Sequence, residues 1–144
     1  MESDARRLAQ HRRVLNDVYL ILNEHPVVCV PLQGFSALPS LAFMHIPPEG
    51  ADGIFNASVC QGPPPREPTS RCPGSETLLE TLASIGTLAV FVGHDHDNSW
   101  CCPGSQLMLC YGRHTGGYGT LTPGARIIDV RLEGKVTVET RVVE

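Results

Sequence analysis

Residues 88–92 are all apolar, and they run directly into the polar segment Gly93-His94-Asp95-His96. A short, unbroken apolar run with β-branched residues is typical of a strand buried on both faces of a sheet. Gly93 permits a close backbone approach at the carboxyl end of this strand, where open sheets place their ligands. The pattern predicts two imidazoles at a sheet edge, facing a shared volume if the backbone stays extended.

A further histidine ends a second apolar run. Residues 41–44 are typical of a buried strand that brings His45 to its end, and the prolines that follow restrict the path of the chain. Neutral imidazole is the commonest protein ligand of transition metals, and nearby carboxylates can orient it. We expect His45, His94 and His96 to converge and hold zinc, iron or manganese. The alternative is a structural His45 beside a polar surface turn.

The Gly-rich segment at residues 111–119 contains Arg113 and His114. These two side chains can hold an anionic substrate group through charge-assisted hydrogen bonds. An equally weighted interpretation is a flexible connection between strands with exposed polar side chains. The Gly-Lys-Ser/Thr ending of a phosphate-binding P-loop is absent, as is the Gly-x-Ser-x-Gly motif of serine hydrolases.

Six cysteines raise the question of zinc or disulfides. The chain has no Cys-x-x-Cys motif, and the adjacent Cys101 and Cys102 do not readily point at one metal, so a structural zinc site is not expected. A bridge from either of them to Cys110 is sterically possible, and free buried thiols are the alternative. A small disulfide-linked secreted domain is a third interpretation.

The length of 144 residues is typical of one domain, and the formal net charge is −4. No basic run extends beyond Arg6-Arg7 and Arg12-Arg13, so a nucleic-acid-binding surface is not expected. The apolar runs are too short to span a bilayer. The first residues lack the hydrophobic core of a signal peptide, which makes the cytoplasm the default expectation.

Hydrophobic spacing predicts a mixed α+β fold. Residues 47–74 are rich in Pro and Gly and are expected to form a long surface loop within the single domain. Ser75 is a candidate N-cap for a helix that Gly86 ends. The expected segments are an amphipathic helix over 4–24, a short strand over 27–30, further strands over 107–111, 125–132 and 136–143, and a tight hairpin turn at Gly134.

Three motifs now stand in a defined order. Gly-His-Asp-His at 93–96 follows Phe-Met-His-Ile-Pro at 43–47 and precedes Leu-Cys-Tyr-Gly at 109–112. In this order they resemble the carboxyl-terminal portion of a calcineurin-like metallophosphoesterase, and most closely the purple-acid-phosphatase-like branch. The resemblance extends from about Ser40 to Arg131.

The resemblance implies that His45 and His94 ligate one metal of a binuclear centre and that His96 ligates the other. It implies two divalent or trivalent transition metal ions (iron, manganese or zinc) and the hydrolysis of a phosphate-ester substrate by a metal-activated hydroxide. The fold implied is a four-layer αββα sandwich of two mixed sheets flanked by helices. This chain is expected to supply part of it, including a carboxyl-terminal hairpin.

The chain also departs from the family pattern. Family members carry Asp-x-His, Gly-Asp-x-x-Asp and Gly-Asn-His motifs before this region, which supply carboxylates, an asparagine and a catalytic histidine. None of these motifs occurs in the sequence, and Asp4 and Asp17 are the candidates upstream of His45, so no catalytic residue is assigned. The family's usual His-Ile-Pro-Leu-Pro-Glu is shortened here to His-Ile-Pro-Pro-Glu at 45–49.

We therefore predict an incomplete metallophosphoesterase domain over residues 1–144. The isolated chain is expected to bind one transition ion weakly and to hydrolyse phosphate esters slowly or not at all. The alternative is a non-catalytic metal-binding or interaction remnant of the same fold. Half of a sandwich exposes apolar strand faces, which favours association through the sheet.

Overall fold

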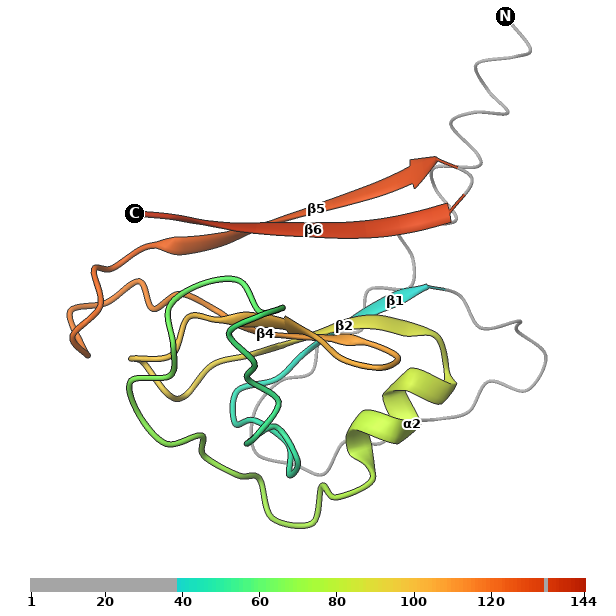
Figure 1. Cartoon of the computed structure of the whole chain (residues 1–144), viewed down its shortest axis with the longest axis horizontal. Coiled ribbons are helices and arrows are strands. Elements are labelled where there is room, and N and C mark those ends of the chain that lie inside the picture. The colour runs from blue at the N-terminus through green and yellow to red at the C-terminus, as the bar shows by residue number, and fades with distance from the viewer. Residues whose placement is uncertain (1–38, 134) are drawn as a thin grey trace, which may run out of the picture.

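A computed structural model of the chain describes residues 39–133 and 135–144. The helix predicted over 4–24, the strand over 27–30 and the turn residue Gly134 lie outside the described residues. Within them, one short helix and a mixed sheet are accompanied by a two-stranded hairpin (Figure 1). The elements are β1 (Ser40–Phe43), α2 (Leu78–Ser84), β2 (Thr87–Val92), β3 (Cys101–Pro103), β4 (Met108–Tyr111), β5 (Ala125–Glu133) and β6 (Lys135–Val143).

The four-stranded sheet has the order β1-β2-β4-β3. Strands β1, β2 and β4 run parallel to one another, and β3 pairs antiparallel with β4 at the edge. In the register of the parallel strands, Phe43 is opposite Phe91 and Val92 is opposite Tyr111. The carboxyl ends of β1, β2 and β4 therefore meet at one edge of the sheet, and the residues that follow them are brought together there.

The two faces of this sheet are covered by different parts of the chain. On one face, Val90, Leu109 and Tyr111 pack with Leu82 of α2 and with Trp100, all of them buried. The spacing of leucines in α2 places its apolar side against this core. The strand predicted over 88–92 is confirmed as β2, and its burial on both faces is confirmed too.

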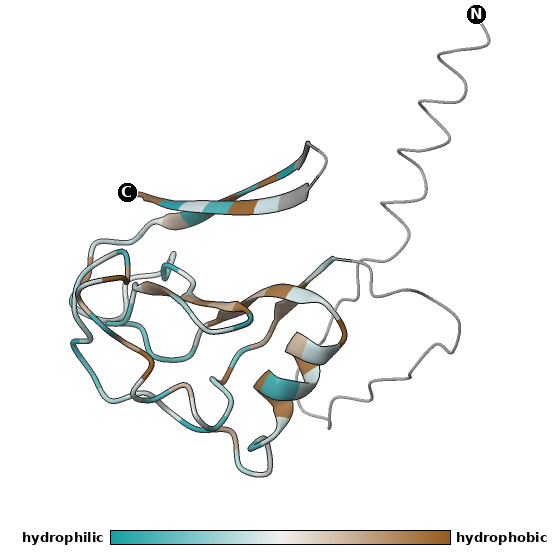
Figure 2. Ribbon diagram, turned by 45° about the vertical axis from the view of Figure 1, so that its right-hand side comes forward, coloured by the Kyte–Doolittle hydropathy of each residue, from teal (hydrophilic) through white to brown (hydrophobic). Residues whose placement is uncertain are grey.

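The hairpin covers the opposite face of the sheet. Ile128 of β5 and Val138 of β6 pack against a cluster that includes Ala89 and Phe91 of β2. Figure 2 shows hydrophobic and hydrophilic residues alternating along β5 and β6, as expected for strands with one buried face. The described residues thus form three layers, with the hairpin, the sheet, and the helix with its neighbouring loops in that order (Figure 1).

The segment 47–74 has no helix or strand, as predicted, and most of its residues are exposed or half-buried. Pro47 and Pro48 are fully buried, and Ala51 contributes to the core. Isolated bridges join Pro48 to Cys72 and Gln61 to Cys101. The few buried residues of this segment cover apolar side chains of the sheet and α2.

Two disulfides join parts of this fold, Cys60–Cys102 and Cys101–Cys110. Adjacent residues of a strand point to opposite faces, so Cys101 bonds across to β4 while Cys102 bonds to the 47–74 segment. Cys72 is a free thiol. Of the alternatives for Cys110, the bridge to Cys101 is the one formed.

Two local expectations need correction. The helix is shorter than its pattern indicated, and its N-cap residue is Thr77 rather than Ser75. The Ser75 hydroxyl donates to the carbonyl of Cys72 and accepts from the amide of Glu49, so it serves the preceding loop. Gly86 follows the helix with a φ of 85°, a conformation that glycine adopts readily. No helix in the described part of the chain is long and apolar enough to cross a membrane.

Candidate functional site

The edge where the parallel strands end carries a pair of histidines. His45 follows β1 and His94 follows β2, and their ring centroids lie 5.3 Å apart with the rings tilted by 59°. The amide of Gly93 donates to the carbonyl of His45 over 2.9 Å, so sheet-like pairing continues past both strands up to this point. Both imidazoles are exposed to solvent. The predicted convergence of these two residues is present.

A buried carboxylate orients one of the two rings. Nδ1 of His94 lies 3.0 Å from Oδ1 of Asp95, whose side chain is almost fully buried. The other oxygen of Asp95 accepts hydrogen bonds from the amide of Ser70 and the hydroxyl of Tyr111. An ionised carboxylate only accepts, so Nδ1 of His94 carries the hydrogen of this contact. In the neutral ring, Nε2 then keeps its lone pair, as in metal-ligating histidines.

The contacts of Asp95 also set its ionisation. Burial by itself raises the pKa of Asp95, but the hydrogen bonds from Ser70, Tyr111 and His94 outweigh it, so the pKa lies below the ordinary value. Burial, followed by the bond to Asp95, raises the pKa of Tyr111. Asp95 is therefore ionised and Tyr111 protonated at neutral pH, which preserves the donor and acceptor roles around His94.

The third predicted ligand lies apart from this pair. His94 has a φ of 69°, a left-handed conformation that is uncommon outside glycine and recurs at functional sites. A turn follows, in which the amide of Asp95 donates to the carbonyl of Gly93. The condition for a shared volume, an extended backbone, is thus not met. The ring of His96 lies 6.0 Å from the rings of both His114 and Tyr118.

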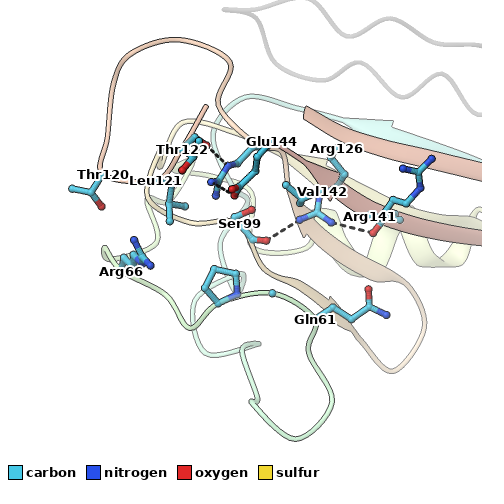
Figure 3. Close-up of a pocket in the computed structure, with 14 residues that line it drawn as sticks. Gln61, Arg66, Ser99, Thr120, Leu121, Thr122, Arg126, Arg141, Val142 and Glu144 are labelled. Carbon is cyan, nitrogen blue, oxygen red and sulfur yellow. Dashed lines mark hydrogen bonds and ion pairs between the residues drawn. The ribbon is translucent and has the colours of Figure 1, made fainter. Parts of the chain in front are cut away.

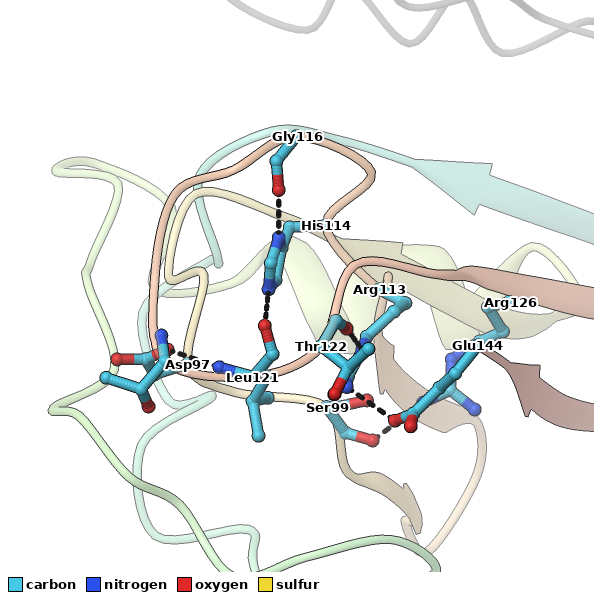
Figure 4. A network of polar contacts seen from close by, with 10 residues as sticks. Asp97, Ser99, Arg113, His114, Gly116, Leu121, Thr122, Arg126 and Glu144 are labelled. Atoms are coloured by element: carbon cyan, nitrogen blue, oxygen red, sulfur yellow. Dashed lines mark hydrogen bonds and ion pairs between the residues drawn. The ribbon is translucent and has the colours of Figure 1, made fainter.

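Arg113 and His114 also separate. Arg113 is buried and donates to the carbonyl of Thr122 and to the carboxylate of Glu144, which line a cavity next to the hairpin (Figure 3). His114 lies between the carbonyls of Gly116 and Leu121, each 2.8 Å from one of its ring nitrogens (Figure 4). The two residues predicted to hold one anionic group therefore face different surroundings.

Asp97, the residue after His96, is hydrogen-bonded to residues that follow the Gly-rich segment. Its Oδ1 accepts from the amides of Thr120 and Leu121, and these bonds, that of Thr120 first, lower the pKa of Asp97. The Gly-rich loop is thereby joined to the segment that follows β2. These contacts explain why His96 packs beside His114 instead of beside His94.

We tested whether these residues suit a metal centre. In residues 39–133 and 135–144, no group of three or more His, Cys, Asp or Glu side chains is placed to hold an ion. The His45–His94 pair offers two imidazoles, one of them oriented by Asp95, and suits partial ligation of one transition ion. The described residues do not complete a binuclear centre, because that would need further ligands, including a bridging group.

Sequence reasoning anticipated a carboxylate near the histidines but not the residues that hold it. Tyr111 belongs to the Leu-Cys-Tyr-Gly motif and lies on β4, so its place beside β2 was open to prediction from the parallel pairing. Ser70 lies in the Pro-rich segment, and no sequence pattern marked it as a partner of Asp95. Its role is to donate a backbone amide, which any residue except proline can do.

Three curated proteins of Arabidopsis thaliana are similar to this chain. "Probable inactive purple acid phosphatase 29" is 35% identical over 114 residues, which cover 73% of this chain and 28% of that protein. "Probable inactive purple acid phosphatase 14" is 33% identical over 109 residues, with 72% and 27% covered. "Probable inactive purple acid phosphatase 28" is 32% identical over 111 residues, with 70% and 26% covered.

The match spans roughly a quarter of the length of these curated relatives and most of this chain. No protein-family model matches the sequence. No solved structure matches it either. The similarity therefore rests on sequence identity over 109 to 114 residues and on the order of the three motifs.

Proposed function

We propose, from the premise that this chain belongs to the purple-acid-phosphatase-like branch of the calcineurin-like metallophosphoesterases, that His45 and His94 hold a transition metal ion. The observation that carries the proposal is the contact between His94 and Asp95. It fixes which nitrogen of His94 is free for a ligand, and a carboxylate in this position raises the basicity of the imidazole. A histidine with a purely structural role would need neither its exposure nor its unusual backbone conformation.

The activity we propose for the family site is metal-dependent hydrolysis of a phosphate ester. A bound ion would supply Lewis-acid polarisation of a phosphoryl oxygen and a more acidic water. His45 and His94 would serve one ion, and His96 the other, in a four-layer sandwich of which the sheet described above is part. The pairing of the His45 and His94 rings supports the assignment of these two residues to one ion.

For this chain by itself we propose weak binding of one ion and little or no turnover. Among residues 39–133 and 135–144, no carboxylate is placed to complete a metal centre with the two imidazoles, which by themselves form an incomplete coordination shell. The alternative is a metal-binding or interaction domain without catalysis. It is favoured by one observation, namely that all three similar plant proteins are named as inactive.

Metal titration of the chain tests the proposal. We expect calorimetry with Zn²⁺ or Mn²⁺ to show about one ion bound per chain, and Asp95→Asn to weaken binding about 10- to 100-fold, the usual effect of losing an orienting carboxylate. His94→Ala and His45→Ala should weaken it at least as much. His11→Ala, which changes a histidine outside the three motifs, is the matched control. Unchanged affinity in His94→Ala would refute the site.

Turnover of p-nitrophenyl phosphate by the same proteins distinguishes a phosphoesterase from a metal-binding domain without catalysis. Turnover that depends on added metal and is lost in His94→Ala would support a phosphoesterase. Metal binding without turnover would support the non-catalytic alternative. Robust turnover would contradict the expectation of weak activity, and turnover that persists in His94→Ala would contradict the assignment of the site.

A further inference from the structure

The cavity next to the hairpin lies where the ends of β5 and β6 meet the loops beside the sheet (Figure 3). Its volume is about 600 Å³. Arginines from four separate segments line it, whereas Glu144 supplies the one carboxylate among its described lining residues. These arginines are Arg66, Arg113, Arg126 and Arg141. None of the histidines predicted to ligate metal lines this cavity, so it is distinct from the His45–His94 edge.

The arginine following β4 is buried in the cavity wall. The side chain of Arg113 is only 4% exposed, while that of its partner Glu144 is 52% exposed. Nε of Arg113 donates to the carbonyl of Thr122 over 2.6 Å, and one terminal nitrogen donates to Glu144. A buried guanidinium is thus paired with a carboxylate that water can reach, and that carboxylate can be exchanged for another anion at modest cost.

The arginine of β5 lies beside it and has neutral partners. Arg126 donates to the carbonyls of Tyr111 and Ser99 and to the hydroxyl of Thr140, at distances between 2.6 and 3.1 Å. Arg113 and Arg126 line the same cavity, and burial, followed by the positive charge of Arg113, lowers the pKa of Arg126. Among the described residues, no carboxylate forms an ion pair with Arg126.

In the part of the chain that the structure describes, the cavity therefore has more positive than negative charge and has guanidinium N–H donors without an acceptor. Of the guanidinium groups of Arg113 and Arg126, only that of Arg113 is paired with a carboxylate of the described residues, and the two exposed arginines at the cavity add further positive charge. Each guanidinium has five N–H donors, and the contacts above use two of those of Arg113 and three of those of Arg126. Such planar donor groups match the oxygens of phosphate and sulfate.

We propose that this cavity binds a phosphate or sulfate group between Arg113 and Arg126, with Arg66 and Arg141 contributing charge from the cavity wall. The Glu144 carboxylate competes with the ligand for Arg113. The prediction that Arg113 binds an anion is thereby refined, since its partner is Arg126 of the hairpin instead of His114. The site does not depend on a metal ion and extends beyond the proposed function.

Binding of inorganic phosphate to the full chain tests this proposal. The experiment uses calorimetry or amide chemical shifts in the presence of a chelator, with chloride holding the ionic strength constant. We expect saturable binding that Arg126→Lys weakens about ten-fold, since lysine keeps the positive charge but lacks the planar, paired N–H donors of the guanidinium. Glu144→Gln should strengthen binding, because the competing charge is removed. Arg131→Gln, on the same strand but outside the cavity, is the matched control.

Several outcomes would overturn the proposal. One is an affinity for phosphate no higher than that for chloride at the same ionic strength. Another is the same affinity for phosphate in the wild type, Arg126→Lys and Glu144→Gln. Loss of phosphate binding in His94→Ala with no effect of Arg126→Lys would place the anion at the histidine edge. That result would leave the proposed metal site standing. Parallel titrations with phosphoserine and sulfate distinguish a phosphorylated ligand from a free anion, and circular dichroism confirms that each variant is folded.

Discussion

The four-stranded sheet and the β5–β6 hairpin are stabilised in different ways. The sheet is buried on both faces, and its residues Ala89, Val90 and Leu109 have almost no exposed surface. The hairpin packs one face on the sheet, its described residues are at most half-buried, and Val130 of β5 is 49% exposed. Strands of the first kind need continuous apolar sequence and strands of the second kind need alternation, so the two regions differ already in pattern.

The difference also separates the two candidate sites. The histidine edge is formed by ends of parallel strands within the sheet, and its orienting carboxylate is buried beneath it. The arginine cavity lies where the hairpin meets the sheet, and its groups come from both regions. A change in the sheet should therefore cost more stability than a change in the hairpin. Four predictions test this ranking.

Loss of the disulfide between β3 and the 47–74 segment should have the largest effect. Cys60 and Cys102 are 42 residues apart, and opening a loop of that length costs about 4 kcal/mol of unfolding free energy. Urea unfolding of the variant with Cys60→Ser and Cys102→Ser measures this loss. The Cys101–Cys110 bridge spans 9 residues, so its removal should cost about 2.5 kcal/mol. Peptide mapping that finds neither linked pair in the oxidised protein would contradict the prediction.

The second prediction compares one core position with one hairpin position. Leu109→Ala should destabilise the chain by about 3 kcal/mol, because the side chain is 1% exposed and its removal leaves a cavity. Val130→Ala should change stability by less than about 0.5 kcal/mol. Thermal and urea unfolding measure both variants. Similar losses in the two would show that the hairpin contributes as much packing as the sheet.

The third prediction concerns the carboxylate beneath His94. Asp95→Asn should cost about 2 kcal/mol, the scale of hydrogen bonds to a charged group. Because the pKa of Asp95 is lowered by folding, its stabilising contribution is complete above the ordinary value of 3.8 and is lost as the pH falls through the lower folded value. Unfolding free energy measured against pH should therefore fall less steeply below pH 4 in Asp95→Asn. Parallel curves for the two proteins would contradict this.

The smallest effect is expected on the solvent side of the hairpin. Arg131 and Glu139 form an ion pair across β5 and β6 with both side chains more than half exposed. Exposed pairs of this kind contribute less than about 1 kcal/mol and are screened by salt. A double-mutant cycle with Arg131→Gln and Glu139→Gln at two salt concentrations measures the coupling. A coupling free energy as large as the stability loss in Asp95→Asn would contradict the ranking.

Sequence patterns located most of the described elements. β2 followed from continuous apolar residues, and β5 and β6 followed from alternation ending near a turn. β3 was missed because Cys101–Pro103 is too short to show a period. The role of Ser75 was misjudged because a serine before a helical pattern can bond to either the helix or the preceding loop, and only packing decides between them.

The candidate site was predictable to the same degree. His45 and His94 were expected to meet because each follows an apolar run, and the carboxyl ends of parallel strands share an edge. The place of His96 could not be predicted, since it depends on the left-handed conformation of His94 and on the bonds of Asp97 to a distant loop. Arg113, which follows β4, and Arg126 of β5 line the same cavity, and this juxtaposition likewise has no local signal.

The amino-acid sequence by itself determined the family, the class of strands, and which histidines end the strands, because periodicity and motif order are local properties of the chain. The tertiary structure decided which carboxylate orients His94, where His96 points, which cysteines pair and which arginines share a cavity. The bonds that hold Asp95 and Asp97 in place, the two disulfides and the bond of Arg113 to Thr122 join residues between 9 and 42 positions apart, and each was one of several that local chemistry allowed. Only the packing of the hairpin, the sheet and the 47–74 segment against one another selects among them.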